Sequence, residues 1–203
     1  MSTAEPFDRI RHVLAAGGNA SSDHDLNGVL PGDGPGRLVE AGVLIPLITR
    51  SAGIQVVLTR RSARLKHHAG QISFPGGRVE AGDGDSRQAA LREAHEEIGL
   101  DPGHVEILGR CPIYETATGF RITPVVGVIR QRVTFVPQAE EVEEIFEIPL
   151  DIATDPGSFT IESRIWRGAR RHYHVLEFGR HHIWGATAGI LHGLACRLSE
   201  PCG

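Results

Sequence analysis

The sequence predicts an α/β fold in which helices pack against a mixed β-sheet. Short segments rich in aliphatic and β-branched residues recur along the chain, with helical patterns before, between and after them. These segments do not follow the regular order of strand, helix and strand, which favours an α/β sandwich over a βαβ series. A chain of 203 residues with 40% hydrophobic residues can form one large domain with a substantial core.

The N-terminal region is predicted to be a helix followed by a loop. Residues 6–16 place apolar side chains at helical spacing, which is typical of a short amphipathic helix. Residues 17–36 are rich in Gly, Asn, Asp, Ser and Pro, and we interpret them as a flexible connection. The chain is therefore divided into residues 1–36, a helix with its Gly/Asp-rich connection, and a main domain of residues 37–203.

Strands and helices are expected along the rest of the chain. The expected strands are residues 38–48, 54–61, 105–110, 122–129 and 133–136, the acidic stretch 140–147, and a hairpin of residues 159–166 and 173–178. The expected helices are residues 86–98, a short segment after Pro149, and residues 186–198. Asp85 can cap the first of these helices and Gly99 can end it. Residues 75–77, Pro-Gly-Gly, are interpreted as a turn flanked by residues 73–74 and 78–79.

Composition argues against several classes of protein. The net charge of −4 is not that of a generally basic nucleic-acid binder. No apolar run approaches the roughly 18 residues of a membrane span, and residues 1–10 lack the apolar core of a signal peptide. Cys111, Cys196 and Cys202 are scattered, which disfavours a disulfide framework or zinc knuckle and favours a reducing, cytoplasmic location.

Charge is distributed in two blocks of opposite sign. Residues 41–79 contain no acidic side chain, whereas residues 80–101 are mostly acidic among their charged positions. The basic residues of the first block are Arg50, Arg60, Arg61, Arg64, Lys66 and Arg78. Two solvated surfaces would explain this pattern, and so would a site that holds phosphates on one side and divalent cations on the other.

Three carboxylates gather on one face of the expected helix 86–98. Glu93 precedes Glu96 by three residues and Glu97 by four, so their side chains share a face and repel one another. Divalent cations would turn that repulsion into coordination, since Mg²⁺ prefers carboxylate oxygens, waters and phosphates. Arg92 could orient one carboxylate. A solvated acidic helix is the alternative, but the preceding glycine turn, which allows close backbone approach to a ligand, favours a site.

The segment around this helix resembles the motif of the Nudix hydrolases, G-x5-E-x7-R-E-U-x-E-E-x-G-U, where U is aliphatic. The second half of the motif matches from Arg92 to Leu100, with Ala94 at the aliphatic position. In the first half Asp83 replaces the glutamate, and eight residues rather than seven follow it. The resemblance implies an α/β/α sandwich with a mixed sheet and a metal-dependent diphosphatase. It assigns the metal ligands Glu93, Glu96 and Glu97, with the Gly77 carbonyl, and the catalytic residues Arg92, Glu93 and Glu97.

A second motif is similar to the coenzyme A pyrophosphatase branch of that family. It reads Leu58-Thr59-Arg60-Arg61-Ser62-x3-Lys66-x3-Gly70-x3-Phe74-Pro75-Gly76-Gly77. Segments 118–127, 141–150 and 183–190 are also similar to this branch, so the resemblance covers about residues 38–198. It implies that water attacks a phosphorus of coenzyme A with the help of Mg²⁺ or Mn²⁺. The products would be 3′,5′-ADP and 4′-phosphopantetheine.

Coenzyme A carries a diphosphate and a separate 3′-phosphate, which call for arginine and lysine contacts. The expected substrate-binding residues are Arg60, Arg61, Arg64 and Lys66, of which about two should touch substrate while the others point into solvent. His67 and His68 are interpreted as loop residues. A metal cluster of His172, His174, His181 and His182 is disfavoured, because alternation along a strand explains the first pair.

The general base is expected outside the helix motif. Five glutamates fall within residues 140–147, and Glu141 is the candidate because it matches the first position of the branch's E-V-x-x-I-F pattern. Two rival functions remain: a Nudix pyrophosphatase for ADP-ribose or NADH, and a non-catalytic Nudix ligand-binding module. The expected partner is a small-molecule substrate, with no nucleic acid and no membrane, and a homodimer is left open.

Overall fold

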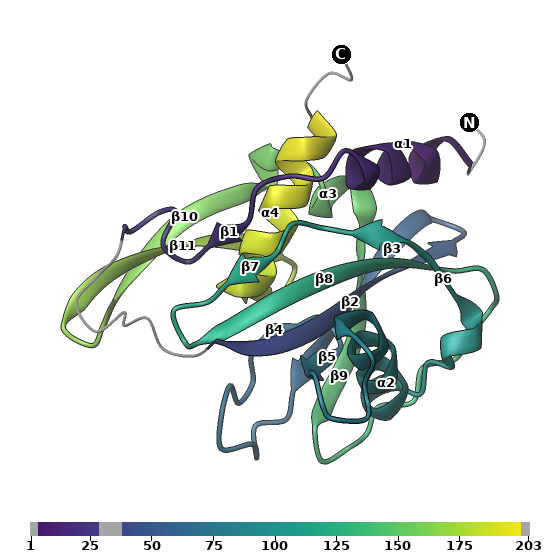
Figure 1. Cartoon of the computed structure of the whole chain (residues 1–203), viewed down its shortest axis with the longest axis horizontal. Helices are drawn as coiled ribbons and strands as arrows, with labels where there is room; N and C mark the ends of the chain where they lie inside the picture. The colour runs from purple at the N-terminus through teal and green to yellow at the C-terminus, as the bar shows by residue number, and fades with distance from the viewer. Residues whose placement is uncertain (1–3, 29–37, 200–203) are drawn as a thin grey trace.

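A computed structural model describes residues 4–28 and 38–199 of the chain. Figure 1 shows a strongly twisted mixed sheet with helices on both of its faces and a long hairpin projecting to one side. The α/β sandwich with a mixed sheet is thereby confirmed. No helix within the described ranges is long and apolar enough to cross a membrane.

The centre of the sheet is formed by three long strands. β2 (Val39–Arg50) runs parallel to β8 (Phe120–Ile129) and antiparallel to β3 (Gly53–Arg61). β9 (Val142–Pro149) pairs with the other edge of β3. The middle of β3, Val56 to Leu58, is fully buried, as expected for a strand covered on both faces.

Shorter strands complete two sheets. The central sheet also contains β1 (Ser21–Ser22), β4 (Ile72–Ser73), β5 (Gly76–Arg78), β6 (Val105–Arg110) and β7 (Tyr114–Glu115). A second, antiparallel sheet consists of β10 (Phe159–Trp166), β11 (Ala169–Phe178) and β12 (His181–Trp184). The expected hairpin is thus confirmed, and its sheet is extended by β12.

Helices cover the central sheet from opposite sides. α2 (Ser86–Ile98) packs on one face, where Ala90, Ala94 and Ile98 are fully buried against β2 and its neighbours. α1 (Ala4–Ala15), α3 (Leu150–Ala153) and α4 (Ala186–Ser199) pack on the other face, around a larger apolar cluster. Two 3₁₀ turns, Pro102–His104 and Pro156–Ser158, lead into β6 and β10.

Two local predictions are wrong. Residues 133–136 form no strand; the N–H of Val136 donates to the Ile98 carbonyl at 3.0 Å, and that of Gln138 donates to the Glu97 carbonyl at 2.9 Å. This segment therefore satisfies carbonyls at the end of α2, which lack partners within the helix. Gly76 and Gly77 are not turn residues but belong to β5 and pair with β2.

The first part of the expected flexible connection packs against the sheet. β1 pairs in parallel with β7, and the Asp23 carboxylate accepts hydrogen bonds from the Tyr114 hydroxyl and the Ala117 N–H, each at 2.8 Å. Asn27 exchanges two hydrogen bonds with the backbone of His172 on β11. Residues 21–27 of the predicted connection are thus packed against the main domain. Residues 29–36 of that connection lie outside the described residues.

Candidate functional site

The helix with the acidic face is fixed at both ends by its own sequence. Asp85 caps its N-terminus, accepting a hydrogen bond from the Gln88 N–H at 2.9 Å, and Gly99 ends it in the left-handed conformation at φ 67°. A Cβ atom on Gly42 of β2 would lie 2.8 Å from the carbonyl carbon of Ser86. Glycine at this position therefore allows α2 to lie directly on the central strand.

Glu97 is the most buried carboxylate of the acidic face. Its side chain is 3% exposed, and it contacts Arg61 Nη1 at 3.4 Å and accepts a hydrogen bond from the Gly76 N–H at 3.3 Å. Burial raises the pKa of Glu97 to about 8, although the Arg61 guanidinium opposes this shift. An ionised Glu97 therefore needs more compensating positive charge than the protein supplies.

Glu93 lies directly against the backbone of β5. A Cβ atom at Gly77 would be 2.5 Å from Glu93 Cδ, so any larger residue would displace this carboxylate. Burial raises the pKa of Glu93, whereas Arg92 lowers it. Glu96 lies at the rim with its side chain 56% exposed, so the three carboxylates run from the interior to the surface.

Arg92 connects these carboxylates to the loop before the helix. It contacts Asp83 through two hydrogen bonds, at 3.1 and 3.0 Å, and contacts Glu93 and Glu96 at 3.0 Å each. Its guanidinium also donates to the Arg78 carbonyl at 3.1 Å. The hydrogen bonds with Arg92 lower the pKa of Asp83. Asp83, which departs from the family motif, therefore holds Arg92 in place.

The donor set fits a hard divalent cation. Glu93, Glu96 and Glu97 supply carboxylate oxygens, and Gly77 places a backbone carbonyl in the strand against which Glu93 rests. Two of these carboxylates have pKa values raised by burial, so a bound cation would stabilise their ionised forms. Arg92 pairs with Glu93 and Glu96, and Arg61 pairs with Glu97, but these guanidinium groups offset the effect of burial on Glu93 and Glu97 only in part.

A cavity of about 390 Å³ is lined by β5, the strand against which Glu93 rests, although no residue of α2 itself lines it. Its wall includes Gly76 and Gly77 of β5 and also Trp184, the last residue of β12 in the second sheet. Three arginines, Arg61, Arg78 and Arg164, line it together with the single carboxylate of Asp23. The other lining residues include Phe74, Phe120, Thr116, Thr118, Thr187 and Ile190. The cavity is thus apolar over much of its wall and predominantly cationic in its charged groups.

Of the four expected substrate-binding residues, Arg61 lines this cavity and the other three do not. Arg60 pairs with Glu144 at 3.5 Å, and Arg64 donates to the Ala139 carbonyl at 3.2 Å. Lys66 is exposed in the loop after β3. His67 is exposed in the same loop, whereas His68 lines the cavity and hydrogen-bonds to Gln71 at 2.7 Å.

Sequence reasoning did not identify Arg164 and Trp184 as site residues. Trp184 stands in one of the segments similar to the coenzyme A pyrophosphatase branch, so a signal for it was present. Arg164 carries no such signal, because its position in the wall depends on how the second sheet packs against the first.

The four histidines of the second sheet are separated by their partners. His181 stacks on Phe146 at 3.7 Å and contacts Glu144 Oε1 at 3.2 Å. His174 stacks on His192 of α4 at 4.0 Å. Each of these two rings is therefore engaged with a different structural partner, Phe146 and Glu144 for His181 and His192 for His174.

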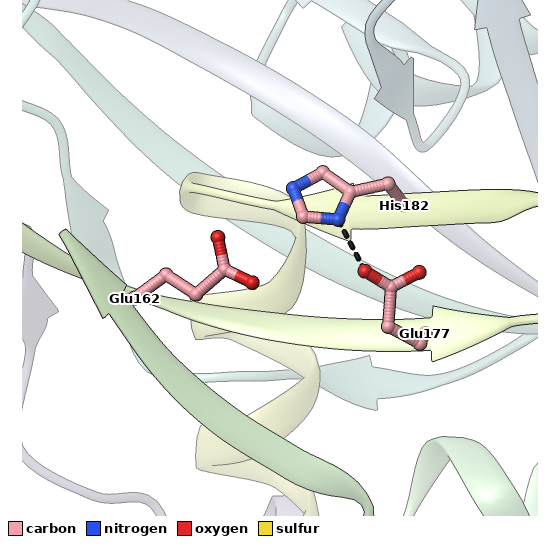
Figure 2. A group of neighbouring side chains, drawn as sticks. All are labelled: Glu162, Glu177 and His182. Carbon is pink, nitrogen blue, oxygen red and sulfur yellow. Dashed lines mark hydrogen bonds and ion pairs between the residues drawn. The ribbon is translucent and has the colours of Figure 1, made fainter. Parts of the chain in front are cut away.

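His182 belongs to an exposed group with Glu162 and Glu177, shown in Figure 2. Their ligand atoms lie within 4.8 Å of one another, and His182 hydrogen-bonds to Glu177. All three side chains are open to solvent on neighbouring strands, and Glu177 and His182 are direct cross-strand neighbours in the register of β11 and β12.

Within the acidic run, paired and unpaired glutamates can be distinguished. Glu147 forms two hydrogen bonds with Arg50 Nε, at 3.1 and 3.0 Å, and Glu144 contacts Arg180 at 2.6 Å. Glu141 is exposed, and its charge raises the pKa values of both Glu93 and Glu97. Glu141 is therefore electrostatically coupled to the acidic helix.

Comparison with known proteins gives consistent matches. Residues 39–162 match the family described as NUDIX domain. The chain is 40% identical to the uncharacterized Nudix hydrolase NudL of Citrobacter koseri over 159 residues, 78% of this chain and 82% of that protein. It is 38% identical to NudL of Escherichia coli strain K12 over the same shares of the two chains.

Solved structures give weaker matches. An Ap4A hydrolase of C. elegans in a binary complex aligns with a TM-score of 0.48 and 20% identity, covering 55% of this chain and 80% of that one. The Nudix hydrolase RenU of M. smegmatis aligns with a TM-score of 0.48 and 22% identity, covering 58% and 81%.

Proposed function

The chain belongs to the Nudix hydrolase family, and from this premise we propose that it hydrolyses the diphosphate bond of coenzyme A or its derivatives. The family membership makes it a diphosphatase acting on a nucleoside diphosphate derivative. The proposed products are 3′,5′-ADP and 4′-phosphopantetheine. The choice of coenzyme A rests on the motif from Leu58 to Gly77 and on the cavity beside it.

The cationic cavity beside β5, where Gly77 contacts Glu93 and Arg61 pairs with Glu97, is the observation that carries this proposal. One cavity contacts both Gly77, beside Glu93, and three arginines distributed along its wall. A ligand that fits it should have a diphosphate near the acidic helix and further negative charge elsewhere. Coenzyme A has this distribution of charge.

Four residues of α2, Arg92, Glu93, Glu96 and Glu97, have roles in the proposed reaction. Glu93, Glu96, Glu97 and the Gly77 carbonyl would hold Mg²⁺ or Mn²⁺, which when bound neutralises the charge that develops on the phosphates. Arg92, held by Asp83, orients the Glu93 and Glu96 carboxylates. Arg61 lies between Glu97 and the cavity, where its guanidinium can bind a phosphate oxygen. Glu141 accepts the proton from the attacking water.

A pyrophosphatase for ADP-ribose or NADH is the second candidate. Both molecules contain a diphosphate and an adenosine, so the same cavity could bind them. Neither carries the ribose 3′-phosphate of coenzyme A, which leaves one arginine of the wall without an anionic partner. A non-catalytic ligand-binding module is disfavoured because Glu93, Glu96 and Glu97 are all present.

The test is product analysis by mass spectrometry on coenzyme A, its disulfide, acetyl-coenzyme A, ADP-ribose, NADH and ATP, with Mg²⁺ or Mn²⁺. We expect 3′,5′-ADP and 4′-phosphopantetheine from coenzyme A at a kcat/KM at least about tenfold above that for ADP-ribose. A higher kcat/KM for ADP-ribose or NADH than for coenzyme A would identify that molecule as the substrate instead. Absence of turnover on every substrate would favour a non-catalytic ligand-binding module.

We further propose a cytoplasmic location. Within residues 4–28 and 38–199, the buried Cys111 is a free thiol, as expected in a reducing compartment. The oligomeric state, monomer or homodimer, is open to measurement by light scattering.

A further inference from the structure

The far part of the cavity wall comes from the second sheet. Arg164 of β10 lies over the indole of Trp184, with its Cζ atom 4.3 Å from the ring centroid, and 5.9 Å from the ring of Tyr173. Both Arg164 and Trp184 line the 390 Å³ cavity and a smaller adjoining cavity of about 90 Å³. A cation stacked on an indole is stabilised there, so the guanidinium is oriented before a ligand binds.

This part of the wall is cationic and aromatic. Among the described residues no acidic side chain pairs with Arg164, which is open to solvent at the mouth of the cavity. The carboxylate of Asp23 already accepts two hydrogen bonds from the protein. In the adjoining cavity the buried Arg171 lies over the Trp166 ring, with its Cζ atom 4.6 Å from the centroid. A ligand bound here should combine negative charge with a flat aromatic group.

We infer that Arg164 and Trp184 bind the 3′-phosphoadenosine end of the substrate, with the purine against the indole and the 3′-phosphate on the guanidinium. This inference rests on the proposed function and adds the orientation of the substrate. Of the two ends of coenzyme A, only the nucleoside end has an aromatic base and a phosphate outside the diphosphate. The pantetheine arm is uncharged and does not require an arginine.

Arg164 in the cavity wall is a better partner for the 3′-phosphate than the basic residues at the end of β3 and in the loop after it. Arg60 is paired with Glu144, Arg64 is bonded to a carbonyl, and Lys66 is exposed outside the cavity. Arg61 lies beside Glu97 and would be engaged by the diphosphate. Arg78 is also beside the acidic helix, because its carbonyl accepts a hydrogen bond from Arg92. Arg164 is the remaining cavity arginine, and no carboxylate of the described residues pairs with it.

The experiment compares Arg164→Ala, Trp184→Ala and Trp184→Phe with wild type on coenzyme A and 3′-dephospho-coenzyme A. Arg164→Ala should raise KM for coenzyme A about tenfold and leave KM for 3′-dephospho-coenzyme A within about twofold, since only the former carries the extra phosphate. Trp184→Ala should raise both KM values at least about tenfold, because both substrates contain the purine, and should raise that for coenzyme A more, because Arg164 loses the ring on which it stacks. Trp184→Phe should retain most of the stacking.

Direct binding gives a second readout that does not depend on turnover. Calorimetry in EDTA should show adenosine 3′,5′-bisphosphate binding about tenfold more weakly to Arg164→Ala than to wild type, with adenosine 5′-monophosphate changed by less than about twofold. Arg170→Ala is the matched control, because Arg170 is exposed on β11, donates to Ser163 Oγ at 3.1 Å and does not line the cavity. Thermal unfolding of each variant checks that it folds.

The outcomes separate the two proposals. Equal losses on both substrates in Arg164→Ala, or a selective loss in Lys66→Ala instead, would overturn the inference while coenzyme A hydrolysis stands. If wild type hydrolyses ADP-ribose but not coenzyme A, the proposed function fails, and the inference fails with it. A selective loss of coenzyme A and adenosine 3′,5′-bisphosphate in Arg164→Ala supports both.

Discussion

Arg92 and Asp83 form a two-point ion pair: Nε donates to Oδ1 at 3.1 Å and Nη2 donates to Oδ2 at 3.0 Å. The Asp83 side chain is 6% exposed and that of Arg92 is 27% exposed, so this pair is partly buried. The same guanidinium contacts Glu93 and Glu96. The aspartate that departs from the family motif is therefore tied to the proposed metal ligands through a single arginine.

Removing the charge of Asp83 should weaken metal binding without removing a ligand. Asp83→Asn is expected to weaken the apparent affinity for Mg²⁺ about 10- to 100-fold, as is usual when a residue that orients ligands is changed. Saturating Mg²⁺ should restore most of kcat. The measurement is activity against Mg²⁺ concentration, with Asp101→Asn, which caps a 3₁₀ turn outside the site, as control. Unchanged metal dependence would show that Arg92 keeps its position without Asp83.

Glu97 should be indispensable for turnover. Glu97→Gln keeps the size of the buried side chain and its hydrogen bond from the Gly76 N–H, but loses the negative charge. We expect kcat to fall at least about 10³-fold, because a lost metal ligand removes several kcal/mol of transition-state stabilisation. EDTA should abolish wild-type activity, and added Mg²⁺ or Mn²⁺ should restore it. Full activity in excess EDTA would refute a metal-dependent mechanism.

Gly77 should tolerate no side chain. In Gly77→Ala the new Cβ would lie 2.5 Å from Glu93 Cδ, so the carboxylate must move away from β5. We expect kcat to fall at least about tenfold and stability to fall by about 1–3 kcal/mol from overpacking. Gly82→Ala is the control, because a Cβ there meets nothing within 4 Å. Equal activity of the two variants would show that Glu93 can function from a different position.

Most of the fold could be predicted from the sequence. Elements set by local signals were predicted correctly, whereas features set by tertiary contacts were not. The bounds of α2 could be predicted because its cap at Asp85 and its stop at Gly99 are local signals. Residues 133–136 have the composition of a strand, but tertiary hydrogen bonds to the end of α2 determine their structure. Arg164 could not be predicted as a site residue, because it reaches the cavity only through the packing of a separate sheet.

The fold should lose stability in mild acid through His174. Burial, together with the stacked His192, lowers the pKa of His174 to about 4, and Asp25 opposes this shift only partly. The unfolded chain, with a pKa near 6.5, binds a proton more readily than the folded chain between about pH 6.5 and 4. This contribution is therefore complete above about pH 6.5 and lost as the pH falls towards 4.

Because the imidazole is only partly buried, the expected loss is on the order of 1 kcal/mol. His174→Gln, which has no titrating group, should unfold at a temperature that varies less between pH 7 and pH 5 than that of wild type. The measurement is thermal unfolding followed by circular dichroism, with His104→Gln, in a partly exposed 3₁₀ turn, as control. An identical pH dependence in His174→Gln and wild type would contradict the assignment.

The final prediction concerns Glu141 as the general base. Its loop is held in place, since the Ser62 N–H donates to the Glu141 carbonyl at 2.8 Å and the Glu141 N–H donates to the Gln138 carbonyl at 3.0 Å. Burial is the main cause of the raised pKa values of Glu93 and Glu97, and the Glu141 carboxylate adds to both shifts. An exposed carboxylate beside the site can accept a proton from water and release it to solvent.

Glu141→Gln should therefore reduce kcat about 10²- to 10⁴-fold, the usual contribution of a general base, and change KM little. It should also remove the acidic limb of the pH–rate profile, because that limb reports protonation of the base. Glu140→Gln, at the exposed neighbouring position, is the matched control and should keep both kcat and the profile of wild type. Glu144 is engaged with Arg180 and His181, so Glu144→Gln should affect stability rather than the profile. Normal turnover of Glu141→Gln across the pH range would exclude Glu141 and leave Glu93 as the next carboxylate to test.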